Sequence, residues 1–365
     1  MELLEIKLPE YPCCRDMWDE LRAEKRPIVI YGMGNGADKL IERLEKYGVS
    51  VSDFFASDGF VRGHYFHGKR VKSFSEIRDE YDNFVILLSF ASARDDVLEM
   101  LCEIDNNYDM IVPDMPVAGM DEYFDKEFYN NNYRDIVSAY NSLCDIQSKN
   151  IFASVLNYKL TGRMKYLMNA YRSTEEKYAF LAQKNIRVAV DAGAYNGDTA
   201  REMKKYIKSL KRVYAIEPDR KNFAKLDRYA QAETEIEVVT INAAAWSESG
   251  VCDFSTSGNR NSTISATPSH EHSNVAVNLV SVDSVCDSVD YIKYDVEGAE
   301  WEALLGSDVT IRTHHPILLV SLYHRSRDIF SITNYIRSQY PEYKLYLSRK
   351  RCTPAWEIEL ICIPE

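Results

Sequence analysis

The stretch Val188-Ala189-Val190-Asp191-Ala192-Gly193-Ala194-Tyr195-Asn196-Gly197-Asp198-Thr199 predicts a β-strand that runs through a glycine turn into a helix. Gly193 and Gly197 flank the turn, where a missing Cβ lets the backbone come close to a ligand. Beyond the turn, apolar residues recur at helical spacing, so the helix presents amide donors and the positive end of its dipole to the turn. These residues are Ala200, Met203, Ile207 and Leu210. The pattern indicates a site for a nucleotide-type cofactor.

Two further strands follow in the order that such a site requires. The run Val213 to Asp219 is a strand that ends in an acid, Glu217, placed about twenty residues after the glycine turn. From this position a carboxylate can accept both hydroxyls of an adenosine ribose. The next strand, Glu237 to Ile241, ends at Asn242-Ala243-Ala244-Ala245, small residues that leave room for an adenine beside backbone amides.

Acidic and basic side chains then follow two more strands. The strand Tyr291 to Asp295 is followed by Val296-Glu297-Gly298-Ala299-Glu300 and a helix. A fifth strand, Pro316 to Leu322, ends at Tyr323-His324-Arg325. In open α/β sheets ligands bind at the carboxyl edge, so both groups should face one site. Alternating residues from Tyr343 to Leu347 and from Trp356 to Cys362 predict a C-terminal hairpin, which completes a seven-stranded sheet.

Four segments together resemble the FkbM-type methyltransferase family: Val190 to Ala194, Ile216-Glu217-Pro218, Asn242-Ala243-Ala244, and Ile292 to Glu300 with its Asp-Val-Glu-Gly-Ala-Glu run. The resemblance covers roughly residues 180–363 and implies a class I, Rossmann-like methyltransferase that uses S-adenosylmethionine. It implies methylation of a hydroxyl of a sugar, glycan or related small molecule. The predicted cofactor-binding residues are Asp191, Gly193, Ala194, Tyr195, Asn196, Gly197, Glu217, Pro218, Asn242, Ala243 and Asp295.

The predicted catalytic residues are His324, Asp295 and Glu297. Many family members carry an acid after the fifth strand, whereas this chain reads Val320-Ser321-Leu322-Tyr323-His324, so the family does not identify the base. His324 could accept the proton of the acceptor hydroxyl, because an unperturbed imidazole has a pKa of about 6.5. Asp295 could instead hold the methionine amine or the acceptor hydroxyl. Glu297 or Glu300 could orient His324, or Glu300 could simply complement the helix dipole. A catalytic metal held by Asp295 with Glu297 or Glu300 is the alternative to direct hydrogen bonding. We predict no metal, because no further ligand set is evident.

The N-terminal part predicts a second, smaller Rossmann-like α/β unit. The apolar run Pro27 to Tyr31 leads into Gly32-Met33-Gly34-Asn35-Gly36-Ala37 and an amphipathic helix, and the next strand ends near Asp58. An NAD-dependent oxidoreductase would place its glycine turn and ribose-binding acid there. We favour a vestigial or partner-binding unit, because nothing downstream supplies a group for hydride transfer.

The predicted domains are the α/β unit at residues 1–125, a helical connector at 126–180 and the methyltransferase domain at 181–365. The connector has apolar helical faces that could pack between the domains or form a homodimer. Between the third and fourth strands, the polar segment Ser255 to Asn274, with Arg260, His270 and His272, predicts a loop over the site. Such a loop could be a lid that selects the acceptor, or only a surface loop.

The amino-acid composition limits which molecules the protein is expected to bind and where it is expected to be found. The net charge of −12 and the lack of a long basic stripe argue against a nucleic acid and favour a small or uncharged acceptor. The one dense basic run, Ser348 to Arg351, predicts a solvated turn between strands. Eight scattered cysteines without a CxxC pair indicate reduced thiols. With no secretory signal and no membrane span, we expect a cytoplasmic protein. The main alternative to an enzyme is a binding or scaffold protein that has lost turnover.

Overall fold

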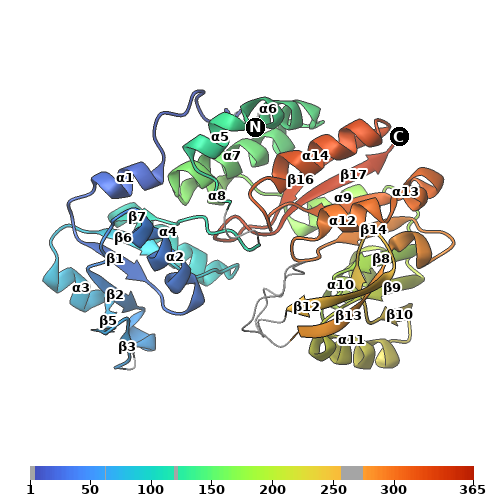
Figure 1. The fold of residues 1–365 in the computed structure, drawn as a ribbon, viewed down its shortest axis with the longest axis horizontal. Coiled ribbons are helices and arrows are strands. Elements are labelled where there is room, and N and C mark those ends of the chain that lie inside the picture. Colours follow the sequence, from blue (N-terminus) through green and yellow to red (C-terminus); the bar gives the residue numbers. More distant parts are fainter. Residues whose placement is uncertain (1–4, 62, 119–121, 256–273) are drawn as a thin grey trace.

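The computed structural model describes residues 5–61, 63–118, 122–255 and 274–365, and it contains two separate large sheets, one parallel and one mixed, with helices between them (Figure 1). The first sheet has five parallel strands in the order β5-β2-β1-β6-β7. Its central strands are continuous apolar runs that are buried along their whole length, as expected for a parallel sheet covered on both faces. The predicted N-terminal Rossmann-like unit is therefore confirmed.

The elements of this first part are β1 (Ile28–Tyr31), β2 (Asp53–Ala56), β5 (Lys72–Ser73), β6 (Val85–Leu88) and β7 (Asp109–Ile111), the helices α1 (Met17–Ala23), α2 (Asn35–Lys46), α3 (Phe74–Glu80) and α4 (Asp95–Asn107), the short helix η1 (Asp58–Phe60), and the hairpin β3 (Tyr65–Phe66) and β4 (Lys69–Arg70).

Five helices connect the two sheets: α5 (Lys126–Asn131), α6 (Tyr133–Ser142), α7 (Ile146–Thr161), α8 (Lys165–Asn169) and α9 (Thr174–Leu181). Helix α7 is buried on almost every side and packs against the second sheet at β16 (Tyr343–Arg349). One apolar core includes residues of the first sheet, such as Ile86, of α7, such as Phe152, and of the second sheet, such as Leu345. The apolar faces predicted for the connector are thus used within this chain.

The second sheet has seven strands in the order β10-β9-β8-β14-β15-β17-β16. Strands β8 (Val188–Ala192), β9 (Arg212–Ile216), β10 (Glu237–Ile241), β14 (Tyr291–Tyr294) and β15 (Ile317–Ser321) are parallel, whereas β17 (Ile358–Pro364) is antiparallel to both β15 and β16. The predicted class I methyltransferase sheet with its C-terminal hairpin is confirmed.

The helices of this part are α10 (Asp198–Tyr206), α11 (Arg220–Ala232), α12 (Glu300–Leu305), α13 (Asp308–His314), α14 (Asp328–Gln339) and η2 (Val282–Ser284). Helix α10 ends before Ile207 and Leu210, which are nevertheless buried. A separate small sheet of β11 (Ala244–Ala245), β12 (Gly250–Ser255) and β13 (Asn274–Val280) follows β10 in the chain. The predicted lid, with Arg260, His270 and His272, lies outside the described residues.

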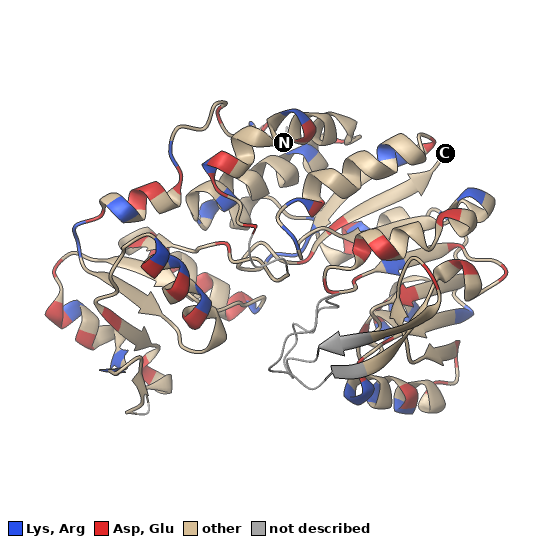
Figure 2. Ribbon diagram, in the orientation of Figure 1, with Lys and Arg blue, Asp and Glu red and all other residues tan. Residues whose placement is uncertain are grey.

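Charged residues of both signs are distributed over both parts of the molecule (Figure 2). In the part of the chain that the structure describes, no helix combines the length and apolar character that a bilayer span needs.

Arg349 departs from the prediction of a solvated turn, because it is the last residue of β16 and has no exposed surface. Its guanidinium donates to the backbone carbonyls of Leu167 at 2.7 Å, Ala170 at 3.2 Å and Cys352 at 2.5 Å. The composition of the run predicted exposure, but the carbonyls at the end of α8 supply an acceptor set that only the folded chain brings together.

Arg349→Met is expected to lower the free energy of unfolding by about 2–5 kcal/mol, because three buried carbonyls lose their donor. Arg351→Met is the matched control. Among the described residues Arg351 forms an ion pair only with the exposed Asp95, at 3.4 Å, and a surface pair contributes about 0–1 kcal/mol. Urea unfolding of both variants measures the difference. Equal stability of the two variants would contradict a structural role for the Arg349 hydrogen bonds.

Candidate active site at the carboxyl edge of the second sheet

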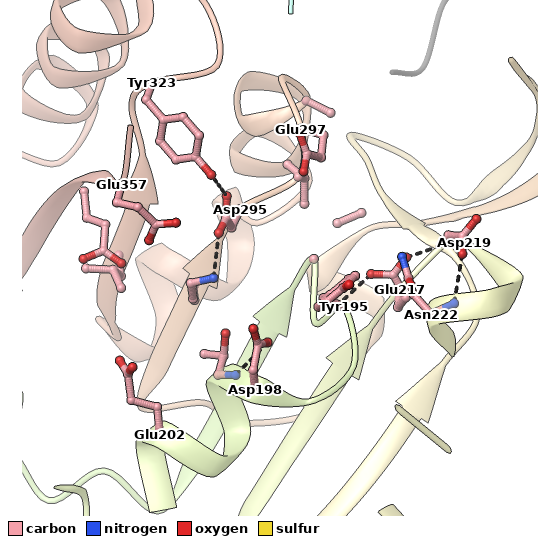
Figure 3. A pocket seen from close by; sticks show the side chains of 18 of the residues that line it. Tyr195, Asp198, Glu202, Glu217, Asp219, Asn222, Asp295, Glu297, Tyr323 and Glu357 are labelled. Carbon is pink, nitrogen blue, oxygen red and sulfur yellow. Dashed lines mark hydrogen bonds and ion pairs between the residues drawn. The ribbon is translucent and has the colours of Figure 1, made fainter. Parts of the chain in front are cut away.

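The carboxyl ends of the parallel strands lie at the same edge of the second sheet. Ala192 pairs in register with both Ile216 and Tyr294, and Tyr294 pairs with Val320. The residues that follow these strands therefore emerge side by side at the carboxyl edge. A pocket of about 670 Å³ opens there, and Gly193, Glu217 and Asp295 all line it (Figure 3).

The glycine turn is shaped by its neighbour β14. Gly193 has φ +88°, and a Cβ on it would lie 1.8 Å from the backbone oxygen of Asp295. The sequence predicted a glycine here for the approach of a ligand, whereas the nearest obstacle is protein backbone. Gly197, with φ +84°, lies against the ring of Tyr229, 2.4 Å from where a Cβ would stand. Both glycines therefore allow close packing around the turn.

Glu217 lies at one end of the pocket and is held by two backbone amides. Its carboxylate accepts from the amide of Tyr195 at 2.9 Å and from the amide of Asp219 at 2.8 Å. Burial outweighs these bonds and raises the pKa of Glu217 to about 7. Each carboxylate oxygen keeps a second lone pair, so Glu217 can accept further hydrogen bonds from a ligand hydroxyl.

Five of the predicted cofactor-binding residues line the pocket: Gly193, Tyr195, Glu217, Pro218 and Asp295. The other six do not line it: Asp191, Ala194, Asn196, Gly197, Asn242 and Ala243. Ala244 and Ala245, the next two small residues after β10, take the place of Asn242 and Ala243 in the lining.

The residues behind the lining support it. Asn242 donates its side-chain amide to the backbone oxygen of Glu217 at 2.8 Å and so anchors the loop that carries this acid. Asp191 has no exposed surface, and burial raises its pKa to about 7. Within the described residues its carboxylate has no hydrogen-bond partner.

Asp295 lines a different part of the pocket from Glu217, between Glu357 and Glu297 in this view (Figure 3). Its Oδ2 accepts from Lys293 Nζ at 2.9 Å and its Oδ1 accepts from the Tyr323 hydroxyl at 3.1 Å. Burial opposes ionisation, but the positive charges of Lys293 and His324 outweigh it and hold the pKa of Asp295 below its ordinary value. Asp295 is therefore ionised at neutral pH.

His324 has no exposed surface and lies among carboxylates. Its Nδ1 is 2.9 Å from Glu300 Oε1, and its Nε2 is 3.5 Å from Glu297 Oε2 and 3.7 Å from Asp295 Oδ1. Burial favours the neutral ring, but the three carboxylates outweigh burial and raise the pKa of His324 to about 9. The prediction of an unperturbed pKa was therefore wrong, because the sequence could not show how many acids surround the ring.

Glu300 is more than a charge at the start of a helix. It is 1% exposed, and its Oε1 accepts from the amide of Val296 at 2.9 Å in addition to facing His324. Of the two roles considered for Glu300, the structure supports contact with His324.

A cluster of charged residues on the pocket wall was not predicted from the sequence. Lys177, on α9, pairs with Glu359 of β17 at 3.0 Å and lies 3.6 Å from Glu202 of α10. All three line the pocket, as do Lys350, Trp356 and Glu357. Glu359 lies between the apolar residues Ile358 and Leu360 of β17. Its partner belongs to the predicted connector, so no local pattern linked the two residues.

The glycine turn of the first sheet is explained by packing. A Cβ on Gly36 would lie 2.2 Å from the backbone oxygen of Ser89, and Asp58 Oδ1 accepts from the amide of Phe74 at 3.1 Å. Both features that suggested a dinucleotide thus have partners within the protein.

Comparison with known proteins identifies the second part of the chain. Residues 191–349 match the family model described as the methyltransferase FkbM domain. The crystal structure of methyltransferase FkbM from Methylobacillus flagellatus KT superposes with a TM-score of 0.68 at 22% identity, covering 94% of this chain and 92% of that one. Aeropyrum pernix fibrillarin in complex with S-adenosyl-L-methionine matches with a TM-score of 0.32 at 12% identity, over 51% of this chain and 73% of that one. No curated protein sequence matches the chain.

Proposed function

Because residues 191–349 form a methyltransferase domain of the FkbM family, we propose that the protein transfers a methyl group from S-adenosylmethionine to a hydroxyl of a sugar, a glycan or a related small molecule. One observation carries this proposal. A single pocket joins a buried acid beside a glycine turn, Glu217, to an ionised acid beside a buried imidazole, Asp295. Glu217 is suited to accept the hydroxyls of a ribose, and Asp295 is suited to bind the hydroxyl that receives the methyl group.

The residues at the Glu217 end fit the proposed cofactor. The Glu217 carboxylate can accept the ribose hydroxyls, and the small side chains of Ala244 and Ala245 leave space for the adenine. The positive end of α10 faces the same turn. When bound, S-adenosylmethionine would supply a methyl group on a positively charged sulfur.

The residues at the Asp295 end would orient the acceptor. Methyl transfer is a displacement that needs the acceptor oxygen in line with the S–CH3 bond, so positioning contributes much of the acceleration. The Asp295 and Glu297 carboxylates can accept the hydrogen of an acceptor hydroxyl. His324 is protonated at neutral pH, so in this state it holds the carboxylates in place instead of acting as the base.

The rim of the pocket supports a hydroxylated acceptor. Trp356 is 37% exposed there, and Tyr323, Glu357 and Lys350 add one aromatic ring, one carboxylate and one ammonium group. Aromatic faces pack on the apolar faces of a sugar ring, while charged groups hydrogen-bond its hydroxyls. Lys177 and Glu359 neutralise each other at 3.0 Å, so this wall offers polarity without a strong net charge.

Incubation with methyl-labelled S-adenosylmethionine and a panel of cell-envelope saccharides is expected to label at least one saccharide. Glu297→Gln should slow the transfer about 100-fold or more, because a group that handles the proton contributes at least this much. Glu297 is 43% exposed, so the variant should fold. Asp287→Asn, an exposed residue outside the pocket, should react like the wild type.

Two outcomes would count against the proposal. If the wild-type protein does not bind S-adenosylmethionine in a calorimetric titration, the methyl-transfer function is wrong. If it binds the cofactor but labels no hydroxylated compound, a binding or scaffold role becomes the better explanation.

A further inference from the structure

We propose that Asp295, Glu297 and His324 bind a divalent metal cation such as Mn²⁺, with Glu300 as the positioning residue behind the imidazole. The inference deepens the proposed function, because the ion would lie at the acceptor end of the same pocket. The proposed metal site itself is argued only from the contacts of these side chains. Among the described residues, ligand atoms of Asp295, Glu300 and His324 lie within 4.8 Å of one another.

The imidazole of His324 is buried, and its Nε2 lacks a hydrogen bond. The residue has no exposed surface, and within the described residues Nε2 makes no hydrogen bond of acceptable geometry. A buried polar group without such a bond is costly, so it calls for a partner. The side chains around Nε2 are carboxylates, which are common metal ligands.

The distances on the Nε2 side leave room for an ion between the ring and the carboxylates. Nε2 is 3.5 Å from Glu297 Oε2 and 3.7 Å from Asp295 Oδ1, at or beyond the limit of a side-chain hydrogen bond. Two ligands that each lie about 2.1 Å from one ion are roughly 3.0–3.5 Å apart. Small side-chain movements would therefore place all three atoms around a single cation.

Glu300 completes the arrangement that metal-binding histidines usually have. The second ring nitrogen of such a histidine donates to a carboxylate, which fixes the orientation and the tautomer of the ring. Here Nδ1 is 2.9 Å from Glu300 Oε1, and the carboxylate is itself held by the amide of Val296 at 2.9 Å. Because Glu300 is 1% exposed, it can hardly move away from the ring.

The backbone brings Glu297 to this place at a cost. Glu297 has φ +53°, in the left-handed region that costs a non-glycine residue about 1–2 kcal/mol. Gly298 follows with φ +96°, and a Cβ there would lie 2.9 Å from Ala118 Cβ. This tight turn lets Glu297 reach back to the ring that Asp295 also faces. Strain of this kind is common where a side chain must be aimed at a ligand.

The chemistry of the ligands selects the cation. Binding would displace the proton that His324 carries at neutral pH, because a metal ligand must be the neutral ring. Two carboxylate oxygens and one imidazole nitrogen then suit a divalent ion such as Mn²⁺, with positions left for water or an acceptor oxygen. Three acids surround the ring, and Lys293 is the cation that pairs with Asp295, at 2.9 Å. A divalent charge would offset this excess of negative charge. A bound ion would polarise the acceptor hydroxyl and make it easier to deprotonate.

The test uses full-length protein stripped with a chelator and titrated with Mn²⁺, with free Mn²⁺ followed by electron paramagnetic resonance. We expect one ion per chain. Asp295→Asn, which keeps the side-chain shape, should weaken binding more than tenfold, and Glu300→Gln should weaken it about 10–100-fold through the ring. Asp79→Asn, an exposed acid on α3, should bind like the wild type. Circular dichroism establishes that each variant is folded.

Two results would overturn the site: no Mn²⁺ bound to the wild type at millimolar concentration, or equal Mn²⁺ affinity in Asp295→Asn and wild type. A calorimetric titration of the same samples with S-adenosylmethionine separates this inference from the proposed function. Binding of Mn²⁺ without the cofactor supports the site and overturns methyl transfer. Binding of the cofactor without Mn²⁺ overturns the site and leaves methyl transfer standing.

Discussion

Gly193→Ala is expected to prevent stable folding of the second sheet. The added Cβ would lie 1.8 Å from the backbone oxygen of Asp295, far inside van der Waals contact. Because that oxygen belongs to the main chain directly after β14, it cannot rotate away as a side chain could. The residue also has φ +88°, which an alanine adopts only with strain. Overpacking and backbone strain each cost about 1–3 kcal/mol, so we expect a combined loss of about 2–6 kcal/mol.

Gly48→Ala is the control for this experiment. Gly48 also has a positive φ, +67°, but no atom lies within 4 Å of its would-be Cβ. It should therefore lose only the conformational term of about 1 kcal/mol. Soluble yield and urea unfolding measure both variants. A Gly193→Ala protein as stable as Gly48→Ala would mean that the turn and β14 can separate at little cost.

Glu217→Gln is expected to weaken the binding of S-adenosylmethionine about 10–100-fold. A hydrogen bond to a charged group contributes about 1.5–3 kcal/mol, and each 1.4 kcal/mol is a factor of ten in affinity. The amide also creates a conflict, because both carboxylate oxygens accept from backbone amides, at 2.9 Å from Tyr195 and 2.8 Å from Asp219. A glutamine must place its NH2 group against one of these donors, which disturbs the turn as well.

Calorimetric titration with S-adenosylmethionine measures the affinity of Glu217→Gln and of Glu202→Gln. Both variants lose one negative charge from the pocket, so the comparison isolates the effect of the contact between Glu217 and the ribose. Glu202 lines the same pocket but lies away from Glu217 (Figure 3). We expect its variant to bind the cofactor nearly as well as wild type. If both variants lose affinity equally, the assignment of Glu217 to the ribose is wrong.

The affinity for the cofactor should also depend on pH with a defined sign. Burial raises the pKa of Glu217 to about 7, so the carboxylate is ionised above this pH and protonated below it. A protonated acid loses much of its strength as an acceptor, so affinity should be constant above about pH 8 and fall by up to about tenfold per unit below pH 7. Asp191 titrates in the same range, with a pKa of about 7, but it does not line the pocket. In Glu217→Gln this pH dependence should largely disappear.

The order of the strands and the edge that bears the site could be predicted from the sequence alone. Apolar runs, glycine turns and helical spacing act within a few residues, so each strand, turn and helix from Val188 to Tyr206 could be recognised in isolation. The right-handed rule for parallel crossovers then places the ends of these strands at one edge. Glu217 and Asp295 were therefore predicted to share a site.

Only the tertiary structure decided which partners these residues meet. His324 follows β15, whereas Asp295 and Glu300 follow β14, so the cluster exists only because the two strands are neighbours in the sheet. Arg349 is buried because the end of α8 covers it, and Gly193 is needed because β14 passes against the turn. Local patterns encode which element a residue belongs to. Burial, pKa values and ligand geometry depend on elements that are distant in the chain and adjacent in space.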